Sequence, residues 1–282
     1  MPLSPRDLVT DNLELVSLPD IVVRINEMVE DPECTAVDIA EVIAEDAALT
    51  ARLLKLVNSP FYNFPSQVDT ISMAITIVGT RQLRDLAMAA AITGRFRHIP
   101  EGLASPDVFW QHNLACATAA RIIARKCGLR NNEQLFVAGL LHDIGKLVMY
   151  LTQPELSRQV LELAKQPDAD LDSLEHIAFG FDHAELGAEL LRQWRLPESL
   201  VMPTRWHHAP EKAGDFRTEA AAVHLANAIA NTVAPCLSPD DDLPIELGVW
   251  QILGLDPAEL DDLIRETGTQ LPGIVAIIYE AA

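Results

Sequence analysis

The sequence contains few cysteines, and they form no pattern that would define a covalent framework. Its 282 residues include four cysteines, far apart in the chain and without any C-x-x-C pair. Disulfide-rich secreted domains carry dense, regularly spaced cysteines instead. We therefore expect reduced thiols that act as packing residues, at Cys34, Cys116, Cys127 and Cys236.

Basic residues are also scarce. Lysine and arginine number 21 against 41 aspartates and glutamates, which gives a net charge of −20. Such a chain repels a phosphate backbone and gains little from counterion release, so we do not expect it to bind DNA or RNA directly. Net charge determines only the electrostatic potential at a distance from the protein. A local basic pocket for one small anion remains compatible with it.

Long apolar runs and strand patterns are missing as well. No apolar run approaches the about 18–20 residues that cross a bilayer, and the first seven residues lack the basic and apolar regions of a signal peptide. We therefore expect a cytoplasmic protein without membrane contact. Strict alternation of apolar and polar residues is absent or short, whereas apolar residues recur at helical spacing through most of the chain. This predicts an all-α fold.

Several helix boundaries can be predicted from local signals. Thr35 with Asp38 is typical of a capping box, Gly79 ends an apolar helix, and Ser105 followed by Pro106 is typical of a helix start. The loop-like residues 98–102 mark the best candidate boundary between two lobes. We predict an N-terminal helical lobe over residues 1–104, a second helical lobe over residues 105–282, and an exposed acidic loop over residues 235–244.

The most informative motif is His142-Asp143 in the apolar stretch from Leu140 to Lys146. We expect the pair to lie within one helix, where an unpartnered imidazole or carboxylate would be costly. Adjacent helical residues point about 100° apart, so both can bind one metal ion beside the helix. Lys146 lies one turn later and can contact a phosphate or pair with Asp143.

Other histidines on separate helices are candidate ligands. A single histidine on an apolar face is more often a hydrogen-bonded core residue, so each of these on its own is a weak indication. Together with the pair they offer five imidazoles and one carboxylate, which suit iron, manganese, zinc or nickel better than calcium. The additional candidates are His112, His183, His207 and His208, whereas His98, His176 and His224 are expected to be surface or structural residues.

About three quarters of the chain resembles the HDOD family, the bacterial "HD-related output domain" branch of the HD phosphohydrolase superfamily. Residues 18–98 are similar to its N-terminal helical lobe and residues 109–231 to its HD-like lobe. The resemblance implies a multi-helix HD-like bundle packed with a helical lobe. It rests on residues 18–19, 43–50, 56–59, 74–79, 109–113, 139–146, 181–185, 207–208 and 223–227.

The resemblance implies a metal site of one or two ions, with two departures from the catalytic members. Catalytic HD enzymes bind metal through a first histidine, the His-Asp pair and a later aspartate, and the metal activates water for phosphoester hydrolysis. Here Asn227 stands at the later aspartate position and brings no negative charge. The second departure concerns cyclic-dinucleotide phosphodiesterases, which carry an HD-GYP signature. This chain has no Gly-Tyr-Pro after His208.

These features leave three functional hypotheses. The preferred one is a non-catalytic regulatory module of bacterial signal transduction that binds a protein partner or a small ligand. The alternative is a metal-dependent phosphohydrolase acting on a nucleotide or another phosphoester, with Lys146 as a phosphate contact. The third is a redox or metal sensor. The oligomeric state stays open.

Overall fold

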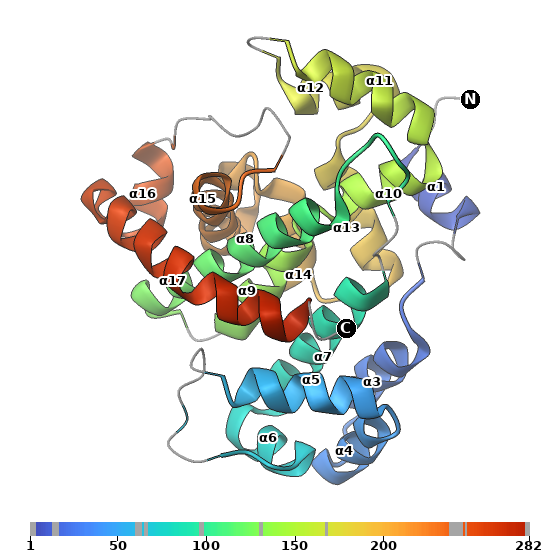
Figure 1. The fold of residues 1–282 in the computed structure, drawn as a ribbon, viewed down its shortest axis with the longest axis vertical. Coiled ribbons are helices and arrows are strands. Elements are labelled where there is room, and N and C mark those ends of the chain that lie inside the picture. The colour runs from blue at the N-terminus through green and yellow to red at the C-terminus, as the bar shows by residue number, and fades with distance from the viewer. Residues whose placement is uncertain are drawn as a thin grey trace. The chain divides into compact units, whose positions relative to one another are not determined.

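A computed structural model describes the protein at residues 4–12, 17–59, 64, 67–95, 99–129, 132–166, 169–236, 245 and 247–279. This part of the chain consists of helices and connecting loops and contains no strand (Figure 1), so the predicted all-α fold is confirmed. Two compact units are present. The larger comprises Met1–Ser17 and His98–Thr269, and the smaller comprises Leu18–Arg97 and Gln270–Ala282.

The smaller unit is built from short helices with clear local start and stop signals. Thr35 and Asp38 form the predicted capping box, and Gly79 ends its helix at a φ of 97°, a left-handed conformation that favours glycine. Buried aliphatic side chains such as Leu53 and Leu83 form its core. Its helices are α3 (Asp20–Glu30), α4 (Ala36–Ala44), α5 (Ala47–Val57), α6 (Ile71–Val78) and α7 (Thr80–Arg95).

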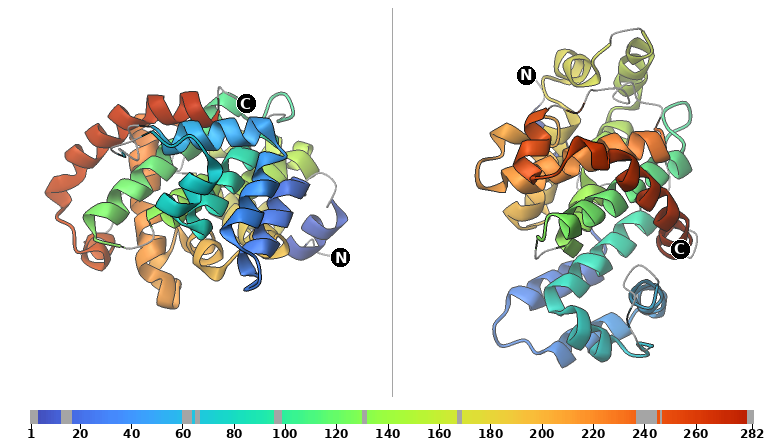
Figure 2. Two further views of the ribbon diagram at one scale, coloured as in Figure 1. Left: turned by 90° about the horizontal axis from the view of Figure 1, so that it is seen from below. Right: turned by 90° about the vertical axis from the view of Figure 1, so that its left-hand side faces the viewer.

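The larger unit contains a central helix, α8, which packs against α9 and α15. Its buried alanines allow close approach, and a Cβ built on Gly139 of α9 would lie 2.9 Å from the Cα of Ala117. The helices of this unit are α1 (Pro5–Asp11), α8 (Pro106–Lys126), α9 (Asn132–Leu141), α10 (Ile144–Thr152), α11 (Pro154–Ala164), α12 (Leu171–Phe179), α13 (His183–Gln193), α14 (Glu198–Trp206), η1 (Pro210–Lys212), η2 (Gly214–Phe216), α15 (Arg217–Val233), α16 (Leu247–Leu253), η4 (Pro257–Glu259) and most of α17 (Leu260–Ile278). Helices α11 and α12 pair at one edge of the unit (Figure 2).

The two units do not follow the predicted lobes at the chain ends. The change of unit at His98 agrees with the loop expected near residues 98–102, but α1 belongs to the larger unit because it packs on α13 and buries Leu8 and Val9. Residues 270–282 belong to the smaller unit. Whether residues 1–104 and 105–282 fold as separate domains stays a prediction, and most of the predicted acidic loop, including residues 240–242, lies outside the described residues.

We expected no segment apolar enough to cross a membrane, and this expectation is wrong for one stretch of the larger unit. Asn132–Thr152 passes that test by length and composition, which alone is weak evidence. Inside the protein 89% of the apolar window is buried, and the stretch consists of α9 and α10 joined at His142 and Asp143. We interpret it as the core of a helical domain, because neighbouring helices already cover its apolar surface.

Candidate metal centre

The His142-Asp143 pair lies at a break between two helices, which corrects the prediction that it sits within one helix. Helix α9 ends at Leu141 and α10 begins at Ile144. The imidazole Nδ1 of His142 donates a hydrogen bond of 2.8 Å to the carbonyl oxygen of Gly139, which a continuing helix would offer to the backbone of residue 143. The break turns the carboxylate of Asp143 toward the other candidate ligands.

Five segments of the larger unit bring all the predicted ligands together. His142 and His183 are fully buried, His112 is 2% exposed, and the side chain of His208 is 16% exposed. His183 is the first residue of α13, where the Asp182 side chain accepts a hydrogen bond from the backbone N–H of Glu185. The other positions are His112 on α8, His207 and His208 in the turn after α14, and Asn227 on α15.

Asp143 lies at the centre of this cluster. Its Oδ1 is 3.3 Å from Nε2 of His183, 3.5 Å from Nε2 of His142 and 3.9 Å from Nε2 of His207. Two ligand atoms that are each about 2.1 Å from one ion lie about 3.0–3.4 Å apart. The distance to His183 lies in this range, and the distance to His142 is 0.1 Å above it. Four groups of potential ligand atoms each lie within 4.8 Å of one another. Two consist of predicted ligands, namely His112–His142–Asp143 and His183–His207–His208, and the other two are Asp172–Glu175–His183 and His176–Asp182–Glu185.

Backbone carbonyls fix which nitrogen of three imidazoles faces the centre. Nδ1 of His142 contacts the oxygen of Gly139, Nδ1 of His207 contacts the oxygen of Thr204 at 2.7 Å, and Nδ1 of His112 contacts the oxygen of Ala234 at 3.2 Å. A carbonyl can only accept, so Nδ1 carries the proton and the neutral ring presents a lone pair on Nε2. Metal-bound histidines carry the same hydrogen bond on the nitrogen that faces away from the ion.

The inward-facing nitrogen atoms of these three imidazoles lack hydrogen-bond donors in the described part of the chain, as expected for atoms that bind a metal ion. Nε2 of His142 and Nε2 of His207 are buried and have no hydrogen-bond partner among the described residues. Nε2 of His112 lies 3.0 Å from Oδ1 of Asn227, so a lone pair meets an amide oxygen. Buried acceptors without donors are costly, and a transition-metal ion satisfies several at once. The residues present therefore fit such an ion.

The electrostatics of the centre also suit a cation. Burial lowers the pKa of His142 to about 4, and burial likewise lowers the pKa values of His112, His207 and His208, so these rings stay neutral as ligands must be. Burial alone would raise the pKa of Asp143, but His142 and Lys146 hold it well below its usual range. These four imidazoles thus offer neutral nitrogens around an anionic oxygen.

Lys146 pairs with Asp143, which is the second of the two roles predicted for it. Its Nζ lies 3.0 Å from Oδ2 of Asp143, and both side chains are buried. A phosphate contact for Lys146 stays a prediction. His176 is exposed, as expected, and His98 lies outside the described residues. His224 has a structural role because its Nδ1 donates to the carbonyl oxygen of His207 at 2.7 Å.

Two carboxylates of α12 were missed by the sequence reasoning. Oε2 of Glu175 lies 2.7 Å from Nδ1 of His183, and Oδ2 of Asp172 lies 3.6 Å from Nδ1 of His208. Burial opposes a charge on His183, yet the neighbouring Glu175 raises the pKa of this imidazole well above its usual value. The only local signal was the i, i+3 spacing of two acidic residues, which is common on exposed helix faces.

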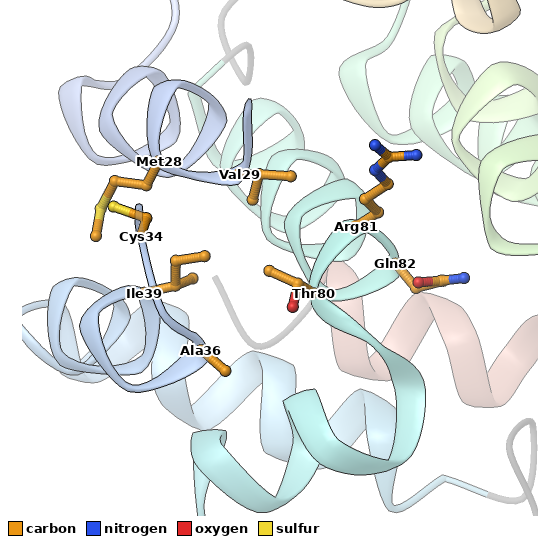
Figure 3. A pocket seen from close by; sticks show the side chains of 8 residues that line it. All are labelled: Met28, Val29, Cys34, Ala36, Ile39, Thr80, Arg81 and Gln82. Atoms are coloured by element: carbon orange, nitrogen blue, oxygen red, sulfur yellow. The ribbon is translucent and has the colours of Figure 1, made fainter. Parts of the chain in front are cut away.

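The smaller unit has a cavity of its own, which contains none of the candidate ligands. It has a volume of about 330 Å³ and lies between the end of α3, the start of α4 and the start of α7 (Figure 3). Five of its eight lining residues are apolar, and Arg81 stands at the start of α7 beside it. The lining residues are Met28, Val29, Cys34, Ala36, Ile39, Thr80, Arg81 and Gln82.

The fold and the histidine cluster define the class of protein. The profile of the HDOD domain matches residues 15–210, and the chain belongs to the HDOD domain family. The chain is 28% identical over 219 residues to an uncharacterized protein of Treponema pallidum (strain Nichols). That match covers 76% of this chain but only 42% of the relative, so the chain spans less than half of that protein's length.

Solved structures agree with this assignment. An HDOD domain protein of unknown function from Geobacter sulfurreducens has a TM-score of 0.74 and 26% identity, over 94% of this chain and 99% of that one. A candidate phosphohydrolase from Shewanella amazonensis SB2B has a TM-score of 0.74 and 25% identity, over 98% of each chain. The chain is therefore similar both to a family member without a known function and to one named for hydrolysis.

Proposed function

We propose that this chain is a cytoplasmic regulatory module of bacterial signal transduction, with a transition metal held in the buried His/Asp centre. The observation that carries the proposal is the convergence of buried Nε2 lone pairs on the carboxylate of Asp143. A bound ion would supply positive charge that links five separate segments of the larger unit. Metal occupancy would thereby set the shape offered to a protein partner or small ligand.

The ligand set supports one or two ions of iron, manganese, zinc or nickel. His112 and His142 face one side of Asp143 together with the amide oxygen of Asn227. His183, His207 and His208 form the second group, in which Nε2 of His183 and Nε2 of His207 lie 3.3 and 3.9 Å from Oδ1 of Asp143. Imidazole-rich sets of this kind bind transition metals, whereas calcium and magnesium prefer sets made only of oxygens.

Two features favour regulation over hydrolysis, namely the neutral side chain of Asn227 and the limited access of solvent to the metal centre. Asn227 supplies a neutral oxygen where catalytic HD enzymes carry an aspartate, which weakens attraction for a metal ion. The inward atoms of His142 and His207 are inaccessible to solvent, and His208 is the most exposed of the candidate histidine ligands. A phosphoester has to reach the ion in order to be polarised, so a closed centre suits a structural or sensing role better.

The proposal is tested by the metal content of protein purified without chelator and without a metal-binding tag. Elemental mass spectrometry should find near-stoichiometric metal in the wild type and in Glu162→Ala, which removes an exposed side chain that pairs with Lys165. His142→Ala should lose it, because this substitution removes one inward lone pair and the hydrogen bond to Gly139. A wild type without metal, or a His142→Ala variant that keeps its metal, would contradict the proposed centre.

The alternative function is a metal-dependent phosphohydrolase, supported by the ligand types and by the name of the Shewanella protein. Asn227→Asp distinguishes the two, because it adds an anionic ligand 3.0 Å from Nε2 of His112. We expect this variant to bind metal about tenfold more tightly, which corresponds to roughly 1.4 kcal/mol. Competition titration with a chromophoric chelator measures this change.

Hydrolysis of bis-p-nitrophenyl phosphate by the same proteins completes the comparison. The regulatory proposal expects none from the metal-loaded wild type. Hydrolysis by the wild type, abolished in His142→Ala, would establish the alternative. Hydrolysis that appears only in Asn227→Asp would support the regulatory proposal, since the neutral residue at position 227 would then account for the missing activity.

A further inference from the structure

Glu175 of α12 contacts a candidate ligand through two separate hydrogen bonds. A single carboxylate oxygen, Oε2, accepts from the backbone N–H of His183 at 2.7 Å and from its imidazole Nδ1 at 2.7 Å. Both residues are buried, with 4% exposure for Glu175 and none for His183. The contact joins α12 to the first residue of α13 inside the larger unit.

The two bonds restrain different degrees of freedom of His183. The backbone bond satisfies one of the four N–H groups that the start of a helix leaves without an intrahelical acceptor. The ring bond places the proton on Nδ1 and turns Nε2 away from α12, toward Oδ1 of Asp143 at 3.3 Å. Glu175 makes the only short contact of a carboxylate with Nδ1 among the described residues, since Oδ1 of Asp172 lies 3.7 Å from the same nitrogen, so the ring depends chiefly on Glu175.

The backbone of His183 is also restrained, by close packing against α10. Gly145 of α10 approaches so closely that a Cβ built there would lie 1.9 Å from the carbonyl oxygen of His183. The histidine is thus held between α10 and the side chain of Glu175. A restraint on both sides leaves Nε2 little freedom to move away from the centre, which is how a preorganised ligand gains affinity.

We propose that Glu175 is a positioning residue that fixes Nε2 of His183 toward the metal centre and thereby sets the metal affinity of the chain. This inference rests on the proposed function, because it assigns a role in the same centre. We assign Glu175 to positioning and not to ligation because its Oε2 accepts two donors from His183. Helix α12 is then the element through which a change at the exposed edge of the unit would reach the metal.

Asp172 provides an internal comparison on the same helix. Its Oδ2 lies 3.6 Å from Nδ1 of His208 and its Oδ1 lies 3.7 Å from Nδ1 of His183. Both distances are beyond a hydrogen bond, and the side chain is 24% exposed. The same chemical change at the two positions should therefore have unequal effects. Asp172→Asn is expected to change metal affinity less than threefold, whereas Glu175→Gln removes the charge from a short, buried contact.

The test is a titration of metal-free protein with zinc in competition with a chromophoric chelator. We expect Glu175→Gln to weaken zinc binding about 10–100-fold, as for other residues that support metal-bound histidines. Glu175→Ala should be weaker still, because glutamine keeps one acceptor oxygen. Glu162→Gln on α11 is the matched control, since Glu162 is exposed and pairs only with Lys165 among the described residues.

A spectroscopic measurement separates positioning from a general loss of structure. In zinc-loaded wild type, proton–nitrogen NMR of the imidazoles should show a His183 Nδ1 proton protected from exchange, and Glu175→Gln should lose that protection. Unchanged zinc affinity in Glu175→Gln together with a protected Nδ1 proton would overturn the inference. An affinity loss with an unaltered His183 Nδ1 signal would overturn it too, because the effect would then arise elsewhere.

Failure of this inference is distinguishable from failure of the proposed function. If the wild type binds no metal, the proposed function is wrong, and the affinity role of Glu175 falls with it. Backbone amide exchange of His183 in the metal-free protein still tests the contact itself, and Glu175→Gln should accelerate it. If the wild type binds zinc and the Glu175 variants match it, only the role of Glu175 is wrong.

Discussion

Substitution of Gly145 by alanine is expected to destabilise the larger unit by about 3 kcal/mol and to weaken metal binding. The added Cβ would lie 1.9 Å from the carbonyl oxygen of His183 and 2.8 Å from the backbone nitrogen of Gly187. Both are backbone atoms of α13, so no flexible side chain can move aside, and α10 has to shift from α13. Overpacking of this kind costs about 1–3 kcal/mol or more, and contact with backbone places it at the upper end.

Urea unfolding followed by tryptophan fluorescence measures this effect. All four tryptophans, Trp110, Trp194, Trp206 and Trp250, belong to the larger unit, so the signal reports that unit. Gly248→Ala on α16 is the control, because a Cβ there meets nothing within 4 Å. It should leave stability unchanged or raise it by up to about 1 kcal/mol. Equal stability of the two variants would refute the close approach of α10 and α13.

Replacement of Lys146 by methionine is the second change for which we expect a large effect. Lys146 and Asp143 are a buried pair with Nζ 3.0 Å from Oδ2. Methionine keeps most of the side-chain volume but leaves the buried carboxylate without its ammonium partner, which costs about 3 kcal/mol. A metal ion at Asp143 would replace the lost charge, so the metal-free variant should be destabilised far more than the metal-loaded one.

Thermal unfolding with and without zinc tests this expectation. The rise in melting temperature on adding zinc should be larger for Lys146→Met than for the wild type, because the variant also loses the repulsion between ammonium and ion. Lys165→Met on α11 is the matched control, since it removes the same i, i+3 pairing from an exposed pair with Glu162 and should change little. Equal zinc-induced shifts in Lys146→Met and the wild type would show that no metal binds beside Asp143.

The sequence was sufficient for features that depend on neighbouring residues. The Thr35–Asp38 capping box, the end of α6 at Gly79 and the start of α8 at Pro106 arise from interactions within one turn. The motif around His142 and Asp143 also pointed to the HDOD family, which the domain match confirmed. The types of side chain available for a metal were therefore known, although their role as ligands stays a prediction.

Only the tertiary structure decided features that depend on contacts between distant segments. The break between α9 and α10 arises because the His142 ring hydrogen-bonds to Gly139, in a stretch whose composition suits one continuous helix. The contact from α12 to His183 through Glu175, and the placement of α1 with the larger unit, have no local signature. Helix periodicity shows which face is buried, but the partner of a buried charge is selected by packing in three dimensions.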